Sequence, residues 1–239
     1  YTNDQVLEDV DLLFTGATRL PADFWDTHAK DMESWKAEQG RTFYRVTGPL
    51  ARTWFPNQFL YDDSERAFEA IVRKIENGSA VIETARDFRG ERHAVWGMTA
   101  RNREQNFALN LLTDPDVDFV TLMGQAGTGK TLLTLAAALT QTLEEKRYAE
   151  IIMTRVTIPV GEDIGFLPGT EEEKMNPWMG ALDDNLEVLS KTDGGAGEWG
   201  RAATNELIRS RIKVKSMNFM RGRTFMNKYV IIDEAQNLT

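Results

Sequence analysis

The chain has 239 residues, enough for one large or two small domains with a proper hydrophobic core. Its hydrophobic content of 41% is ordinary for a soluble protein, and its net charge of −9 argues against non-specific nucleic-acid binding by the whole chain. The sequence contains no cysteine, which excludes disulfides and thiolate metal sites and fits a reducing compartment such as the cytoplasm.

No uninterrupted apolar stretch approaches the length of a membrane span, and no signal peptide opens the chain, so we expect neither membrane insertion nor secretion. The first residue is Tyr1 rather than Met, which predicts that the native start is missing. The acidity is uneven. Residues 1–40 carry nine acids and three bases, whereas residues 119–239 carry sixteen acids and fourteen bases.

Residues 1–40 form an acidic segment for which we expect mostly helix, with Phe24, Trp25 and Trp35 buried. Residues 41–97 change character and predict a small β-rich module. Its expected elements are strands at 42–46 and 58–61, an amphipathic helix at 65–76, and a hairpin that pairs 80–84 with 93–96.

From about residue 100 the pattern alternates between helices and continuous apolar strands, which is typical of a buried parallel sheet. In such sheets the ligand site lies at the carboxyl ends of the strands. The expected helices are 102–112 and 132–143, and the expected strands are 119–123, 150–154, 212–215 and 229–233.

A glycine-rich turn joins the first of these strands to the following helix and has the pattern G-x-x-x-x-G-K-[ST] of a phosphate-binding P-loop. Glycines let the backbone N–H groups wrap a phosphate, and the helix N-terminus adds its positive dipole end. A plain turn that merely starts a helix is the alternative. The predicted nucleotide-binding residues are Gly124, Gln125, Ala126, Gly127, Thr128, Gly129, Lys130 and Thr131, with Lys130 on the β/γ-phosphates and Thr131 on Mg²⁺.

The strand at 229–233 ends in two carboxylates, Asp233 and Glu234. Asp233 is placed to bind Mg²⁺ as Walker B aspartates do, and Glu234 to position or deprotonate the attacking water. An acidic helix start is the alternative interpretation. A second acid of this kind favours hydrolysis of ATP over transfer to a substrate hydroxyl, and no guanine-reading N-K-x-D motif is present.

Two further features have less specific signals. Gln105 can offer its amide to the edge of an adenine ring, or it can be an exposed helical glutamine. Between Leu207 and Ile232 there are seven basic residues and no acid, which fits either contact with phosphates or a solvated strand face. These basic residues are Arg209, Arg211, Lys213, Lys215, Arg221, Arg223 and Lys228.

Several of these strings together resemble the PhoH-like ATPases, relatives of superfamily 1 helicases with a RecA-type core. The strings are Arg101–Gln105, Phe107–Leu109, Val120–Thr131, Gly161–Gly169 (G-E-D-I-G-F-L-P-G), and Arg221–Phe225 through Asp233–Asn237 (D-E-A-Q-N). The resemblance runs from about residue 95 to the end. It implies ATP hydrolysis coupled to nucleic acid, usually RNA, and we expect a single strand as the partner. The position after the strand at 150–154 places Arg155 and the Gly161–Gly169 loop at the same sheet edge, where they would couple the nucleotide to RNA. Arg155, Arg221 and Arg223 are the candidate nucleic-acid or phosphate contacts.

The first residues, Tyr1–Gly16, are similar to the end of the PIN ribonuclease domain in PIN–PhoH fusions, whose metal-binding acids would lie upstream. The resemblance also implies a homo-oligomeric ring, such as a hexamer, and sensor and arginine-finger elements after Thr239. We therefore expect a chain truncated at both ends, whose own turnover of ATP is slow.

The expected fold is α/β: an incomplete P-loop NTPase sheet of RecA type, preceded by a small mixed N-terminal part. We expect a PIN-like tail at 1–40, a β-rich linker module at 41–97 and the ATPase domain at 98–239. Two other functions remain open, a DNA-directed superfamily 1 motor and a nucleotide-dependent switch that does not hydrolyse ATP.

Overall fold

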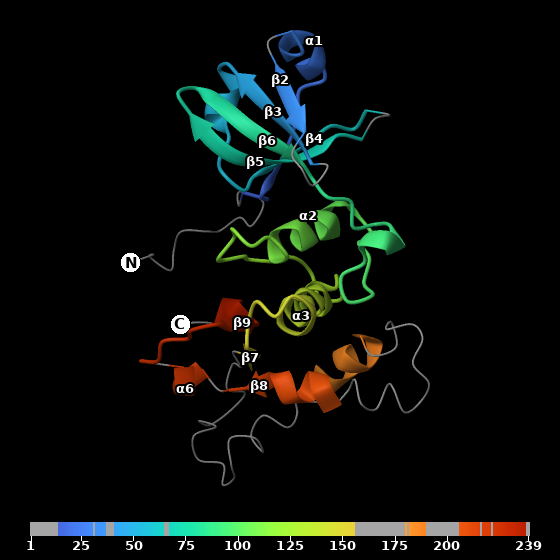
Figure 1. Cartoon of the computed structure of the whole chain (residues 1–239), viewed down its shortest axis with the longest axis vertical. Coiled ribbons are helices and arrows are strands. Elements are labelled where there is room, and N and C mark those ends of the chain that lie inside the picture. The colour runs from blue at the N-terminus through green and yellow to red at the C-terminus, as the bar shows by residue number, and fades with distance from the viewer. Residues whose placement is uncertain are drawn as a thin grey trace. The chain divides into compact units, whose positions relative to one another are not determined.

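The computed structural model describes residues 14–30, 32–36, 41–64, 67–155, 180, 182–189, 206–215, 217–220 and 222–237. The chain divides into two compact units, Tyr1–Arg86 and Asp87–Thr239 (Figure 1). Among the described residues, no helix is long and apolar enough to cross a membrane.

The first unit is built on one six-stranded sheet with the strand order β1-β4-β5-β6-β3-β2. All neighbouring strands are antiparallel except β1 and β4, which are parallel. The elements are β1 (Ala17–Arg19), α1 (Phe24–His28), β2 (Glu33–Lys36), β3 (Thr42–Thr47), η2 (Leu50–Thr53), β4 (Phe59–Tyr61), β5 (Glu69–Glu76) and β6 (Ser79–Thr84). Since β1 and β2 belong to this sheet, the division we expected at residue 40 falls inside one structural unit.

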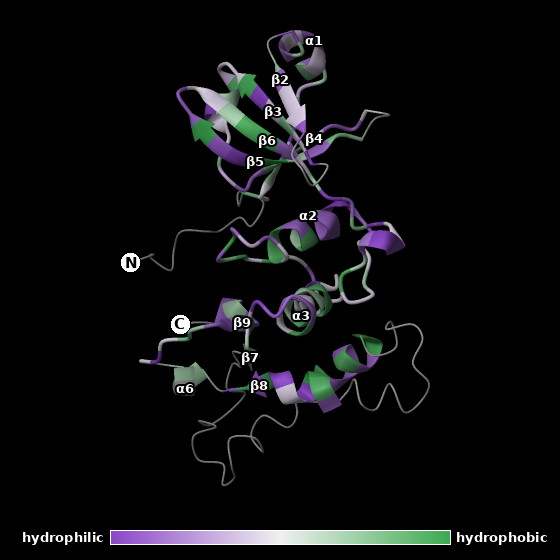
Figure 2. Ribbon diagram, in the orientation of Figure 1, coloured by the Kyte–Doolittle hydropathy of each residue, from purple (hydrophilic) through white to green (hydrophobic). Residues whose placement is uncertain are grey.

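The main hydrophobic core cluster of this unit packs on one face of the sheet, and Phe59 and Ile71 are buried outside this cluster. Val46, Ala80 and Ile82 point to that face from the central strands. Phe24 of α1 and Trp54, which follows η2, pack against the same cluster and are buried. Hydrophobic and hydrophilic residues mix along the strands (Figure 2).

The helix predicted at 65–76 is wrong, because Glu69–Glu76 form strand β5. A β-bulge between Val72 and Lys74 shifts the alternation of the strand, so that Val72 and Ile75 both face the core. Their spacing of three residues imitates a helix. The strand turns into β6 at Asn77 and Gly78, whose φ angles of 50° and 78° suit a two-residue type I′ hairpin loop.

Two other expectations for this part of the chain are wrong. Within the described part of residues 1–40, helix is confined to α1, and Trp35 lies on strand β2 with 40% of its surface exposed. The hairpin between 80–84 and 93–96 does not form, since β6 pairs with β5 and β3. Residues 91–93 form instead a short 3₁₀ helix, η3 (Glu91–His93).

The second unit contains a three-stranded parallel sheet with the order β8-β7-β9, which confirms the predicted parallel α/β fold. Its elements after η3 are α2 (Arg103–Leu112), α3 (Lys130–Leu139) with a π-helical turn η4 (Thr140–Glu144), β7 (Glu150–Arg155), β8 (Ile212–Val214), α6 (Met217–Met220), β9 (Lys228–Asp233) and the 3₁₀ helix η6 (Ala235–Asn237). Residues 182–189 and 206–211 are also helical.

The central strand β7 is buried on both faces: Ile151 and Met153 point to one side, Ile152 and Thr154 to the other, and all four are at most 1% exposed. The apolar face of α3, from Leu133 to Leu139, packs into the same core cluster as Ile151 and Met153. Together they fix the start of α3 beside the sheet.

The expected strand at 119–123 does not form, because these residues do not pair with any described strand of the sheet, although their side chains alternate in exposure as in a strand. Val120 and Leu122 pack against the core, whereas Phe119 and Met123 are 83% and 65% exposed. On β9, Val230 and Ile232 are also more than a third exposed, so this side of the sheet is open.

Glu150 ties the amino ends of all three strands together. Its two carboxylate oxygens lie 2.5 Å from Nζ of Lys213 on β8 and 2.8 Å from Nζ of Lys228 on β9. Only 16% of the Glu150 side chain is exposed. The hydrogen bonds from Lys213 and Lys228 lower the pKa of Glu150 from 4.5 to about 2.

We expect this contact to make the stability of the protein sensitive to acid. Because the folded-state pKa is depressed, the contribution of Glu150 is complete above its unfolded pKa and is lost as the pH falls from about 4.5 to about 2. Glu150→Gln should therefore lower the unfolding free energy at pH 7 and flatten its fall below pH 4.5. Urea unfolding across this range measures both effects.

The matched control is Glu76→Gln, which removes a carboxylate from an exposed pair with Lys74. It should leave the unfolding curve nearly unchanged. Equal curves for wild type and Glu150→Gln at both ends of the pH range would contradict the role given to Glu150.

Candidate nucleotide-binding site

The glycine-rich turn leads directly into α3. Gly124, Gly127 and Gly129 have φ angles of 154°, 78° and 85°, a region that side-chain-bearing residues rarely adopt. Gly129 is the N-cap of α3 in the left-handed conformation, and Lys130 is the first helical residue. The loop therefore uses backbone conformations that favour glycine, and it ends at a helix N-terminus, which favours anions.

The Lys130 side chain folds back across its own loop. Its Nζ donates hydrogen bonds to the carbonyl oxygens of Gly124 and Gln125, both at 2.7 Å, and lies 3.4 Å from Oγ1 of Thr128. The Thr128 hydroxyl donates in turn to the Gln125 carbonyl at 2.8 Å. The ammonium is therefore held at the loop, where it can exchange carbonyl partners for phosphate oxygens.

Thr131 and Asp233 meet although they are about a hundred residues apart in the sequence. The Thr131 hydroxyl on the first turn of α3 lies 3.5 Å from Oδ1 of Asp233 at the end of β9. Mg²⁺ binds oxygens at about 2.0–2.1 Å in octahedral geometry and takes only one or two protein ligands beside phosphate and water. The two oxygens fit such a shell. The described residues contain no cluster of three or more potential metal ligands, so a cage made wholly of protein groups is not seen among them.

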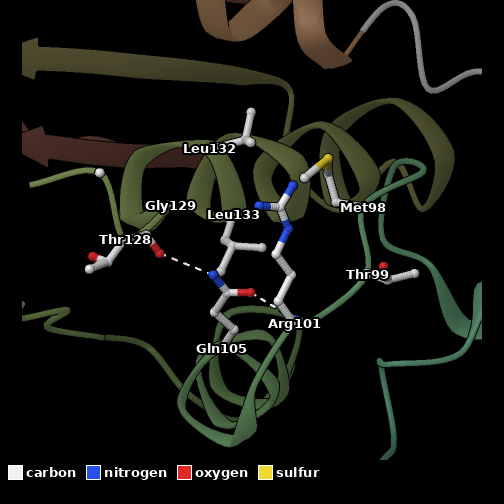
Figure 3. A pocket seen from close by; sticks show the side chains of 9 residues that line it. Met98, Thr99, Arg101, Gln105, Thr128, Gly129, Leu132 and Leu133 are labelled. Carbon is white, nitrogen blue, oxygen red and sulfur yellow. Dashed lines mark hydrogen bonds between the residues drawn. The ribbon is translucent and has the colours of Figure 1, made fainter.

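Gln105 connects α2 to the loop. Its Nε2 donates to the Thr128 carbonyl at 3.1 Å, and its Oε1 accepts from the Arg101 backbone N–H at 2.8 Å (Figure 3). Asn102, the N-cap of α2, accepts from the Gln105 backbone N–H and so fixes the turn that presents this side chain. The amide keeps one N–H and one oxygen lone pair for a further partner.

A pocket of about 150 Å³ lies between Gln105 and the loop. Its volume is well below that of a complete small-molecule site, so it suits one part of a ligand. Figure 3 shows Gln105 reaching toward Thr128 and Gly129. The pocket is also lined by Arg101, Gly127, Met98, Thr99, Leu132 and Leu133. The last four were not predicted from the sequence, because none of them belongs to a recognisable motif.

Glu234 follows Asp233 with its backbone in the left-handed region, at φ 53°. Such a conformation is strained for glutamate, and strain of this kind is concentrated at functional sites. One carboxylate oxygen, Oε2, accepts a hydrogen bond of 2.5 Å from the Gln236 amide. The backbone thus turns sharply where β9 ends, and η6 begins one residue later.

The basic residues between Leu207 and Ile232 do not form one surface. Lys213 and Lys228 bind Glu150 at the amino ends of the strands, away from the loop. Arg209 pairs with Asp183 at 2.9 Å, and Arg211 donates to the Ala149 carbonyl. Lys215 is different, because it follows β8 at the carboxyl edge, where its backbone N–H donates to the Met153 carbonyl.

The remaining candidates are only partly described. Arg155 is the last residue of β7 and pairs in register with Asp233, so its backbone lies at the carboxyl edge as expected. Arg223 lies in the turn after α6. Arg221 and the Gly161–Gly169 loop lie outside the described residues.

Comparison with known proteins decides the family. The model of the family "PhoH-like protein" matches residues 97–239, which include the P-loop and both acids of the β9 end. The chain is a member of the PhoH-like family.

Curated PhoH-like relatives extend the match into the first unit. The chain is 38% identical to Protein PhoH2 of Bacillus subtilis over 200 residues, which cover 84% of this chain and 44% of that protein. It is 40% identical to Protein PhoH2 of Mycolicibacterium smegmatis over 63% of this chain and 32% of the relative, and 34% identical to a PhoH-like protein of Synechocystis over 74% and 50%. The chain thus spans half or less of these relatives. The family match covers the glycine-rich loop at Gly124–Thr131 and the acids at the end of β9.

Proposed function

We propose that this chain binds Mg-ATP between the P-loop and the end of β9 and hydrolyses it with Glu234 as the general base. The observation that carries this proposal is the approach of Thr131 to Asp233 beside a glycine-rich loop whose three glycines have positive φ. The loop N–H groups and Lys130 would hold the β/γ-phosphates. Thr131 and Asp233 would hold Mg²⁺, which supplies charge neutralisation at the phosphates.

Glu234 would accept a proton from the attacking water. Its position directly after Asp233 and its left-handed backbone support this role. Gln105 and the pocket beside it would hold adenine, with the free amide groups on the edge of the base and Leu132 and Met98 on its faces. Because Gln105 also holds the Thr128 carbonyl, the base and the phosphates would be bound by one connected structure.

We further propose that ATP hydrolysis is coupled to single-stranded RNA and its unwinding. Lys215 and Arg155 at the carboxyl edge, near the ATP site, support this proposal. The resemblance of residues 1–16 to the end of a PIN domain supports an upstream ribonuclease in the intact protein. The family resemblance supports assembly into a ring. Measuring ATP hydrolysis by the complete protein with RNA, with DNA and with neither separates this proposal from a DNA motor and from a switch without turnover.

Lys215 offers a specific test of the RNA contact. Each phosphate contact to a single strand contributes about 0.7 to the slope of log K against log salt. Lys215→Gln should therefore weaken RNA binding and reduce this slope by about 0.7. The control is Lys146→Gln, which removes an exposed lysine from the connection before β7. An unchanged slope for Lys215→Gln would show that Lys215 does not contact RNA phosphates and is a solvated residue at the strand end.

A further inference from the structure

The first unit carries an aromatic and cationic surface on the face of its sheet that points away from the core. Trp35 on β2 pairs in register with Phe43 on β3, and Glu33 pairs with Arg45. The alternate residues Tyr44 and Val46 of β3 belong to the core cluster. Because side chains alternate along a strand, Trp35, Phe43 and Arg45 share the opposite face.

Four side chains, two aromatic and two cationic, form a row in this region. The Phe43 and Trp35 rings stack with centroids 5.7 Å apart and planes 12° from parallel. Cζ of Arg41 lies 5.9 Å from the centre of the Phe43 ring, and Cζ of Arg45 lies 5.8 Å from that of Trp35. We call the row Arg41, Phe43, Trp35 and Arg45 the Trp35 ladder.

Trp35 and the two arginines of the ladder are exposed, Phe43 is half-buried, and carboxylates position both guanidinium groups. The Arg41 and Arg45 side chains are 41% and 51% exposed. Arg41 Nη1 lies 3.0 Å from the buried Glu83, and Arg45 Nη1 lies 3.0 Å from Glu33. A guanidinium carries five N–H donors, so each arginine keeps donors beyond its carboxylate contact. Cross-strand packing alone would explain a ring pair, but it does not require a tryptophan exposed to 40% between Phe43 and Arg45.

We propose that the Trp35 ladder binds single-stranded RNA. Rings and guanidinium planes stack on unpaired bases, and the free guanidinium donors bind phosphates. Nearby polar groups on the same face suit a ribose 2′-hydroxyl: the Glu33 carboxylate, and the hydroxyls of Thr47 and Ser79, which lie 2.9 Å apart. The choice of RNA over DNA rests also on the proposed function, whereas the stacking surface itself is independent of the ATP site.

The test is RNA binding by the full chain without nucleotide. The probe is a fluorescent oligouridylate of about 10 nucleotides, within the usual site size of single-strand binders. Stacking of one base on an aromatic ring is worth about 1–3 kcal/mol, so Trp35→Ala should weaken binding roughly 5- to 150-fold. Trp35→Phe should retain most of the affinity. Trp35→Thr removes the ring but keeps a residue that favours strands, so it should weaken binding as Ala does while preserving the fold.

Matched controls separate this site from the ATP site. Phe55→Ala removes a ring that is 60% exposed in the same unit but lies outside the ladder, and should bind RNA as wild type does. Trp35→Ala should bind an ATP analogue normally, so a failure of the ATPase proposal would leave this result unchanged.

Three outcomes would overturn the inference. If a folded Trp35→Ala or Trp35→Thr variant bound the oligouridylate with wild-type affinity, the ladder would have only a cross-strand packing role. Equal, Trp35-dependent binding of the matching oligodeoxyuridylate would show that the surface does not select RNA. No binding of the oligouridylate by the wild-type chain would leave the surface to another class of partner, such as a protein.

Discussion

Lys130→Ala is expected to abolish detectable ATP binding. In the structure the Lys130 ammonium is held by the carbonyls of Gly124 and Gln125, directly at the loop that would receive the phosphates. No other residue of Gly124–Thr131 carries a positive charge, so nothing in the loop can replace it at the β/γ-phosphates. Titration with a fluorescent ATP analogue measures the loss.

The control for this variant is Lys146→Ala, which removes an exposed lysine of the same unit and should bind the analogue as wild type does. Because Lys130 also braces the loop, Lys130→Met provides a second variant that keeps the side-chain stem. Its circular dichroism and thermal unfolding should match wild type. Affinity equal to wild type in both Lys130 variants would show that the nucleotide is bound elsewhere.

Glu234→Gln is expected to retain Mg-ATP but to lower turnover by roughly 10²–10⁴, the usual contribution of a general base. The substitution keeps the size of the side chain and removes only its basicity, so ground-state contacts should survive while the transition state loses its proton acceptor. Phosphate release by the complete protein with RNA, at saturating ATP, measures the effect on kcat.

Glu144→Gln is the matched control, since it removes a carboxylate from the π-helical turn after α3 and should leave turnover unchanged. If Glu234→Gln hydrolysed ATP near the wild-type rate, the glutamate would be an acidic residue at the start of η6 and the base would have to be sought elsewhere. Loss of Mg-ATP affinity together with turnover would point instead to a binding role.

The features that the sequence predicted well are those with a fixed spacing and a local cause. The P-loop glycines predicted a backbone able to wrap a phosphate, and all three adopt positive φ. Asn102 and the apolar face of α2 predicted that helix to within one residue. The continuous apolar runs of β7 and β9 predicted a parallel sheet, and its carboxyl edge brings Thr131 to Asp233.

The features that the sequence did not predict depend on partners far along the chain. The bulge in β5 gave its apolar residues the spacing of a helix, and only pairing with β4 and β6 shows that it is a strand. The basic run looked like one surface, but Glu150 draws Lys213 and Lys228 to the amino edge. Trp35 was expected in a core because a large ring usually needs burial, whereas it is 40% exposed and lies beside Phe43 and Arg45.

The placement of Glu150 at one end of β7 and of Asp233 beside the other end has a thermodynamic consequence. Strand β7 has six residues, so at about 3.3 Å per residue its two ends lie about 16 Å apart. Substitutions at sites separated by more than about 7–10 Å, with no shared partners, usually have additive effects. The ionic contact of Glu150 and the phosphate- and metal-binding edge are therefore energetically separable. Selection can adjust the stability of the sheet at one end without disturbing the chemistry at the other.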